Sequence, residues 1–298
     1  MGTDKRNFRS AYYEKVGCRG VEEKKSLELL MSDIPWDKVK LKQFCLRFSV
    51  PATHRNLVWK VLFGILPLYP DIHTFIWEQR STQYYDLMNA LEILAIKCQH
   101  PIEALYSIWL LETGKLKPDP IVSFFLLTKY CYLEITFKAI ATTLSKLYDD
   151  KIDVYWFTKS FCNEVKNFLA DIPKMVDTFR IILEKEDQLL YSHLATLRGM
   201  EVLPLNKWFH CCFAGVLDEI SLAKIWDKIC CGAHKILPYV GVMLVITLRR
   251  CILQAHTSEQ LLKCMKELPE QCEDVLANKA IELWQHHEAL QGNTHIKK

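Results

Sequence analysis

The amino-acid sequence predicts an all-α protein on the basis of three observations. Only 10 of the 298 residues are glycine, roughly half the usual ~7% share, which disfavours a turn-rich β fold. Apolar residues recur at helical spacing in almost every segment. The β-branched stretch 135–144 has neither the alternation nor the hairpin turn of a strand, so it is also predicted to be helical.

Helix start and stop signals divide the chain into successive predicted helices. Val58, Leu62 and Ile65 lie at i, i+4 and i+7, and Gly64 marks the end of that helix. In the second half of the chain, Ser221 is the predicted N-cap of a helix that ends at a glycine. The helices predicted there cover residues 221–232, 257–269 and 272–290.

The chain is long enough for one large core or for two closely packed helical subdomains. An acidic run at 148–153 follows a long apolar stretch and predicts a weak boundary near residue 150. The expected division comprises an N-terminal helical extension (1–49), an N-terminal subdomain (50–150), a C-terminal subdomain (151–292) and a flexible tail (293–298).

Composition and charge exclude several classes of function. The first ten residues are charged and lack the apolar core of a secretory signal. The most apolar run, Ile236–Leu248, has 13 residues, whereas a membrane span needs about 20. A net charge of +3 without a basic stripe argues against nucleic-acid binding. We therefore expect a cytoplasmic protein with no transmembrane segment and with Ile236–Leu248 as a core helix.

The 12 cysteines and the scattered histidines predict neither a metal site nor a disulfide framework. No CxxC occurs, and the two vicinal cysteine pairs lack the spacing of a zinc site, so buried reduced thiols are expected. Gly114 and Lys115 do not form a phosphate-binding loop, because Trp109 occupies the position of the required glycine. No cofactor and no autonomous active site is predicted.

A surplus of apolar residues between positions 81 and 98 suggests a helix that contacts a partner. A helix at the rim of a fold needs one apolar face, whereas this segment carries two stripes. The broad stripe is expected to contact a partner helix if it is exposed; the alternative is that both stripes are buried in the fold. The broad stripe comprises Tyr84, Leu87, Met88, Leu91, Leu94, Ala95 and Cys98, and the narrow stripe comprises Tyr85, Ile93 and Ile96.

Two groups of motifs occur in a defined order along the chain. Arg55-x-x-x-Trp59 precedes "LFGILP", and segment 189–232 contains apolar and aromatic motifs that end in "IWD". In this order they resemble the TBC domain, the helical fold of the Rab GTPase-activating proteins. In that family the first motif's arginine is separate from the catalytic finger, so Arg55 is expected to lie beside Trp59 in a structural role. The resemblance implies these structural motif residues: Arg55, Trp59, Trp208, Phe213, Trp226 and Asp227.

The resemblance also implies where catalytic residues would lie. Active TBC domains use an arginine in Ile-x-x-Asp-x-x-Arg and a glutamine in Tyr-x-Gln-Gly, and an arginine finger contributes ~10³–10⁵ in rate. Between Pro67 and Phe179 the only arginine is Arg80, and neither motif occurs; the glutamine finger's neighbourhood reads "LYSIWLLETGKLKPD". The chain is therefore expected not to be an enzyme. The alternative is a GTPase-activating protein that uses Arg80 and Gln79 as displaced fingers.

Several segments, among them "RNFRSAYYEKVG", "LETGKL" and "WFHCCFAG", resemble a finger-less branch of the family. That branch accompanies hamartin and tuberin in the tuberous sclerosis complex. The resemblance implies a non-catalytic subunit that binds the C-terminal coiled coil of hamartin, and tuberin through it, and restrains Rheb and mTOR complex 1. It also implies recruitment to lysosomal or vesicle membranes through the complex. The rival classes are a protein acting on a Rab-type GTPase and an adaptor with another partner.

Overall fold

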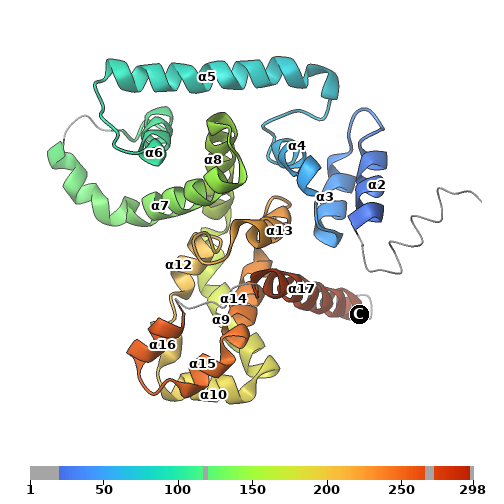
Figure 1. The fold of residues 1–298 in the computed structure, drawn as a ribbon, viewed down its shortest axis with the longest axis vertical. Coiled ribbons are helices and arrows are strands. Elements are labelled where there is room, and N and C mark those ends of the chain that lie inside the picture. Colours follow the sequence, from blue (N-terminus) through green and yellow to red (C-terminus); the bar gives the residue numbers. More distant parts are fainter. Residues whose placement is uncertain (1–19, 117–119, 266–271, 296–298) are drawn as a thin grey trace, which may run out of the picture. The chain divides into compact units, whose positions relative to one another are not determined.

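A computed structural model describes residues 20–116, 120–265 and 272–295 (Figure 1). Within these ranges every regular element is a helix, which confirms the predicted all-α class. The chain forms two compact units, residues 1–82 and 83–298. The first 19 residues of the expected N-terminal extension and residues 296–298 of the expected tail lie outside the described residues, and the last helix runs to His295.

The described part of the first unit contains three short α-helices, one 3-10 helix and the start of a long α-helix. These are α2 (Gly20–Leu30), α3 (Lys38–Arg47), α4 (Ala52–Leu62), the 3-10 helix η1 (Pro70–Ile72) and the beginning of α5 (His73–Ile93). Asp37 caps α3, because its carboxylate accepts hydrogen bonds from the Val39 and Lys40 amides. Helix α4 ends just before Gly64, whose φ of +74° favours glycine, so the predicted stop is confirmed.

A buried lysine holds the start of α5 against α4 in the first unit. The Lys60 side chain is 9% exposed, and its Nζ lies 3.4 Å from the centroid of the Trp77 ring. A desolvated ammonium over an indole face is a favourable cation–π contact of ~2 kcal/mol or more. The contact therefore anchors the first turns of a helix that has few other buried side chains.

The second unit contains the rest of α5 and every later element. Helices α6 to α10 come first, followed by short helices and a final long helix. Their bounds are α6 (Pro101–Glu112), α7 (Pro120–Leu147), α8 (Lys151–Phe168), η2 (Leu169–Asp171), α9 (Ile172–Glu186), α10 (Gln188–Thr196), α11 (Gly199–Val202), α12 (Leu205–His210), α13 (Glu219–Ile229), η3 (His234–Ile236), α14 (Leu237–Thr247), α15 (Arg249–Gln254), α16 (Ser258–Cys264) and α17 (Glu273–His295).

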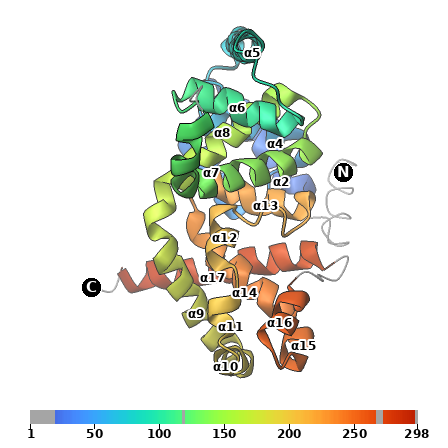
Figure 2. The same ribbon diagram turned by 90° about the vertical axis from the view of Figure 1, so that its left-hand side faces the viewer.

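Helix α14 lies at the centre of the second unit. It packs against α9 and α17, and Figures 1 and 2 show the three helices meeting below the middle of the picture. At Gly241 the backbone approaches α9 so closely that a Cβ would lie 3.1 Å from the Phe179 ring. The prediction of a core helix within Ile236–Leu248 is confirmed. No helix in the described ranges is long and apolar enough to cross a membrane.

Two details of the predicted helices need correction. The N-cap of α13 is Asp218 and not Ser221, because the Asp218 carboxylate accepts hydrogen bonds from the Ile220 and Ser221 amides. Helix α16 ends at Cys264, five residues before the predicted stop at Pro269, and residues 266–271 lie outside the described residues. The stretch 135–144 is helical within α7, as predicted.

The expectation that all cysteines are reduced is wrong for one pair. Cys251 and Cys264 form a disulfide that joins α15 to α16, with a Cα–Cα distance of 5.8 Å. Their spacing is unlike that of a metal or redox motif, so the sequence offered no signal for the bond. Eight further cysteines whose side chains the structure describes are free thiols, and six of them are buried.

The boundary predicted near residue 150 falls inside the second unit. Residue 150 is the N-cap of α8, where the Asp150 carboxylate accepts a hydrogen bond from the Ile152 amide. Helices α7 and α8, on either side of this position, pack against each other. The division at residue 150 therefore stays a prediction.

Candidate functional site

The two apolar stripes of α5 have different environments. In the broad stripe, Tyr84 and Leu91 are buried and Leu87 and Met88 are half-buried, whereas Leu94, just beyond the helix, is exposed. The Tyr84 ring lies 5.8 Å from the Tyr155 ring of α8, centroid to centroid, and burial is the main cause that raises the pKa of Tyr84. The broad stripe thus faces the second unit itself.

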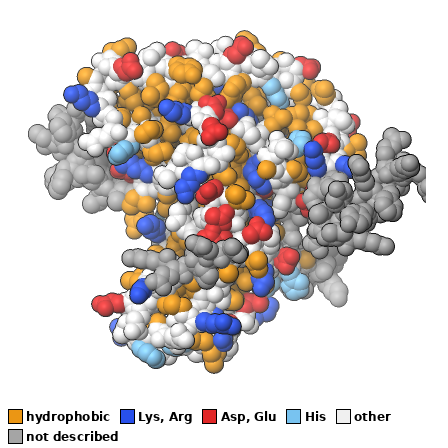
Figure 3. Space-filling model, viewed as in Figure 1, with side chains coloured by type: hydrophobic (Ala, Val, Ile, Leu, Met, Phe, Trp, Pro, Cys, Tyr) orange, Lys and Arg blue, Asp and Glu red, His pale blue; other side chains and the backbone are white. Residues whose placement is uncertain are grey.

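The narrow stripe is the exposed one. Ile93 is 84% exposed and Tyr85 is 58% exposed, and Ile96 is half-buried. Exposed acidic side chains, Asp86 and Glu92, lie beside them. Figure 3 shows hydrophobic side chains between acidic ones at the top of the view, where Figure 1 places α5.

The burial of the two stripes changes which residues of α5 are candidates for contact with a partner. The sequence assigns the broad stripe to a partner only if it is exposed, and the burial of Tyr84 and Leu91 removes that assignment for them. The large apolar side chains of this segment that remain exposed are Tyr85, Ile93 and Leu94; we call these three residues the α5 patch.

A carboxylate from α6 joins three elements of the second unit beneath α5. Glu112 Oε1 lies 2.5 Å from Lys159 Nζ and accepts a hydrogen bond of 3.1 Å from Gln83 Nε2. Glu112 Oε2 accepts a hydrogen bond of 2.6 Å from the Tyr155 hydroxyl. Burial, followed by this hydrogen bond, raises the pKa of Tyr155 far above its usual value.

The Glu112 network lies in the segment that the family resemblance assigns to the glutamine finger. A residue that orients an attacking water must keep a free polar atom directed towards it. Both carboxylate oxygens of Glu112 are engaged with Gln83, Tyr155 and Lys159. The group is thus arranged as an anchor between α5, α6 and α8, a role that sequence patterns did not indicate.

The two displaced-finger candidates lie on α5 in the first unit. Gln79 is exposed, and Arg80 is half-buried. Arg80 precedes Tyr84 by four residues and Leu87 by seven, so helical spacing places it on the same face of α5 as these two residues. Of the two, only Gln79 has an exposed side chain.

The later motif residues converge on one buried turn of the second unit. The Trp208 and Phe213 rings lie 5.7 Å apart, and Trp226 Nε1 donates a 3.0 Å hydrogen bond to the Cys212 carbonyl. Cys212 and Phe213 both have positive φ angles, a conformation that costs about 1–2 kcal/mol in a non-glycine residue. The aromatic contacts and the indole bond therefore hold a backbone that is unfavourable on its own. Asp227 follows on α13 and is fully buried.

The first motif lies in the first unit. Arg55 Nη2 donates a 2.7 Å hydrogen bond to the carbonyl of Val50, at the entry to α4, and Trp59 is completely buried. The arginine thus binds the chain just before its own helix, which is a structural contact. Among the described residues, no group of His, Cys, Asp and Glu is placed to hold a metal ion.

The fold and the motifs are those of a TBC-domain protein, and comparison with known proteins establishes this class. Residues 128–253 match the Rab-GTPase-TBC domain, and the chain belongs to the TBC-domain family. It is 39% identical to TBC1 domain family member 7 of Homo sapiens and to that of Bos taurus, in each case over 95% of both chains. The relative of the same name from Danio rerio is 37% identical over 94% of both chains.

Solved structures support the same fold. The Ypt/Rab-GAP domain of Gyp1p superposes with a TM-score of 0.60 at 12% identity, covering 90% of this chain and 99% of that one. The Chlamydomonas flagellar RabGAP TBC domain has a TM-score of 0.56 at 15% identity, covering 94% and 96%. At these identities the likeness concerns the fold alone.

Proposed function

We propose that this chain is a non-catalytic TBC-domain subunit that binds the coiled coil of hamartin through the α5 patch. By holding hamartin together with tuberin it would restrain Rheb and mTOR complex 1 at lysosomal membranes, to which the complex recruits it from the cytoplasm. The single observation that supports this proposal is the exposure of Tyr85 and Ile93 on α5 and of Leu94 directly after it, although the helix buries Tyr84 and Leu91. The choice of hamartin rests on the family resemblance.

The shape of α5 suits a helical partner. The helix has 21 residues and is about 30 Å long, so it can pack lengthwise against a coiled coil. An amphipathic helix binds a partner by its apolar positions, and flanking charges select that partner. Asp86 and Glu92 lie beside the α5 patch, so the partner should carry basic side chains next to its apolar seam.

The absence of catalysis is supported by the Glu112 network. Within the segment assigned to the glutamine finger, Glu112 has both of its oxygens bound to neighbouring side chains. Arg80 is half-buried and lies on the face of α5 that also carries Tyr84. Neither residue is positioned as a free group that could stabilise charge on a transferred phosphoryl group.

The test is co-purification with a hamartin C-terminal coiled-coil segment, followed by light scattering. Tyr85→Glu with Ile93→Glu should abolish the complex and leave helical circular dichroism unchanged, because both side chains are exposed. Asn89→Glu, at another exposed position of α5, is the matched control and should leave binding intact. Leu87→Glu with Leu91→Glu should disturb folding as well as binding, because Leu91 is buried.

Two results would contradict the proposal. A well-folded chain that forms no complex with hamartin would remove the assigned partner. GTP hydrolysis by a Rab-type GTPase that is accelerated by this chain, and that is lost in Gln79→Ala or Arg80→Ala, would establish the catalytic alternative.

A further inference from the structure

The second unit contains a pocket that the proposed function does not use. Its volume is about 460 Å³, within the range of small-molecule sites. One wall is a single face of α9 with its preceding turn, and the other is η3 with the start of α14; a residue of α17 completes the lining. We call it the α9–α14 pocket and define it by Asp171, Met175, His234, Lys235, Tyr239 and Glu288.

The lining of the pocket is partly apolar. Met175 and Tyr239 come from opposite walls, and each is about 5% exposed or less. Pro238, one residue before Tyr239, adds a buried ring. The Tyr239 hydroxyl lies 3.4 Å from His287 Nδ1 of α17, which holds the phenol ring in place. These residues can cover an aliphatic group of moderate size.

Part of the charge in the pocket is already neutralised. The Asp171 carboxylate lies 3.7 Å from Lys174 Nζ and 3.5 Å from His234 Nε2. The His234 ring stacks on Phe168, with 4.9 Å between ring centroids. Burial is the main cause that lowers the pKa of His234, so the imidazole is neutral at pH 7. The Asp171 carboxylate is therefore paired with Lys174 and lies beside an uncharged imidazole.

Two opposite charges in the same pocket are left over. Within the part of the chain that the structure describes, neither Lys235 of η3 nor Glu288 of α17 forms an ion pair, with each other or with another residue. Both side chains line the pocket. Each acts on a neighbouring lining residue, since Lys235 contributes to the lowered pKa of His234 and Glu288 to the raised pKa of Tyr239.

We propose that the α9–α14 pocket binds a small zwitterion of the amino-acid type. The carboxylate of the ligand pairs with Lys235, its ammonium pairs with Glu288, and its side chain lies on Met175, Pro238 and Tyr239. A zwitterion can pair with Lys235 and Glu288 at the same time, whereas a ligand with one charge can pair with only one of them. This site is independent of the α5 patch and of hamartin.

Three probes with the same n-butyl side chain differ only in which charged groups they carry. L-Norleucine carries both charges, n-pentylamine lacks the carboxylate, and hexanoate lacks the ammonium. Binding to the full chain is followed by the imidazole NMR resonances of His234. We expect L-norleucine to bind with a dissociation constant on the order of a millimolar. Each singly charged probe should bind about ten- to a hundredfold more weakly, because a charged hydrogen bond is lost.

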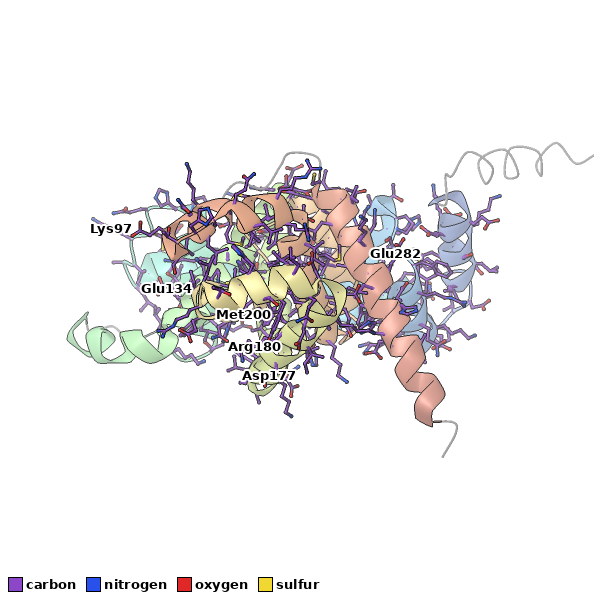
Figure 4. All side chains as sticks on the ribbon, turned by 90° about the horizontal axis from the view of Figure 1, so that it is seen from below. Lys97, Glu134, Asp177, Arg180, Met200 and Glu282 are labelled. Carbon is purple, nitrogen blue, oxygen red and sulfur yellow. A yellow bond between two sulfur atoms is a disulfide. The ribbon has the colours of Figure 1, made fainter. Side chains whose placement is uncertain are left out.

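Two variants test the assigned partners. Lys235→Gln and Glu288→Gln should each weaken L-norleucine binding about tenfold or more. Both side chains are exposed, so the thermal unfolding midpoint should not change. Glu282→Gln, two turns earlier on α17 (Figure 4), and Lys279→Gln are matched controls, because both residues are exposed and outside the lining. These controls should bind L-norleucine as the wild type does.

Several outcomes would overturn the assignment. If pentylamine or hexanoate binds as tightly as L-norleucine, the pocket does not recognise both charges of the ligand. Shifts that persist in Lys235→Gln and Glu288→Gln would place the ligand elsewhere. Glycerophosphoethanolamine is a fourth probe: if it binds and L-norleucine does not, the ligand is a phospholipid headgroup and not an amino acid. No shift with any probe also refutes the proposal.

Discussion

Helices α14 and α5 are both rich in apolar residues, but only one of them is enclosed by the protein. Helix α14 has apolar residues on all sides and buries nearly all of them against α9, α17 and their neighbours. Helix α5 has polar residues between its two apolar stripes, and it buries the broad stripe while exposing the narrow one. The distribution of apolar residues around a helix, more than their number, thus decides whether some remain available for a partner.

The largest expected effect is the difference in stability between two variants that place the same charge on α14 and on α5. Val242 of α14 is completely buried, so Val242→Asp places a carboxylate in apolar surroundings and should cost more than about 4 kcal/mol of unfolding free energy. Ile93→Asp on α5 should change stability by no more than about 0.5 kcal/mol. Urea unfolding followed by circular dichroism measures both. Equal stability losses would show that α5 is not an exposed helix.

The second effect concerns the disulfide of the unit that contains α14. Cys251 and Cys264 are 13 residues apart, and closing a loop of this length in the unfolded chain stabilises the fold by about 3 kcal/mol. A reducing agent should lower the free energy of unfolding by that amount in the wild type. In Cys251→Ser the reducing agent should have no effect. An equal response in both proteins would mean that the loss does not come from the bond between Cys251 and Cys264.

The third effect tests how α5 is attached in the first unit. Lys60→Met keeps most of the side-chain volume but removes the ammonium over Trp77, so it should destabilise the chain by about 1–2 kcal/mol. Trp77→Leu removes the other partner. In a double-mutant cycle the two changes should be coupled, because they break the same contact. Strictly additive losses would mean that the cation–π contact contributes nothing.

Much of the contrast between α14 and α5 could be predicted from the sequence. The apolar run of α14 is too short to span a membrane and too apolar for a helix on the protein surface. The sequence therefore predicted a helix buried in the core. The two stripes of α5 were also visible. Which stripe faces outwards could not be predicted, because both are apolar and only the neighbouring elements, such as Tyr155 beside Tyr84, decide it.

The parts that could not be predicted depend on residues distant in sequence. Glu112 has partners 29, 43 and 47 residues away, and no local pattern signals that these side chains meet. The pairing of Cys251 with Cys264 among 12 cysteines is likewise a property of the folded chain. The N-cap predicted at Ser221 was a local error, because Asp218, three residues earlier, is an equally good capping residue and accepts hydrogen bonds from the Ile220 and Ser221 amides.

The smallest effect is a pH dependence at the start of α17, another helix that packs against α14. Glu273 Oε2 accepts a 2.6 Å hydrogen bond from the Asp218 amide. Burial and the Asp218 carboxyl group raise the pKa of Glu273 to about 7, from an ordinary value of 4.5, and Glu219 adds to this repulsion. Nearby lysines are already engaged, because Lys224 pairs with Asp274 and Lys146 lies 3.5 Å from Glu219.

The sign of the effect follows from the proton balance. Between pH 4.5 and 7 the folded chain holds a proton on Glu273 that the unfolded chain has released, so the Glu273 contribution to stability falls as the pH rises through this range. His234 and His287, whose pKa values are lowered mainly by burial, act in the opposite direction.

The measurement is therefore the difference between the wild type and Glu273→Gln, in which position 273 no longer titrates. After allowance for solvent screening, the wild type should lose about 1 kcal/mol relative to the variant between pH 5 and pH 8. Parallel stability curves would show that Glu273 is not protonated in the folded chain, and the link between α17 and α13 would then not respond to pH.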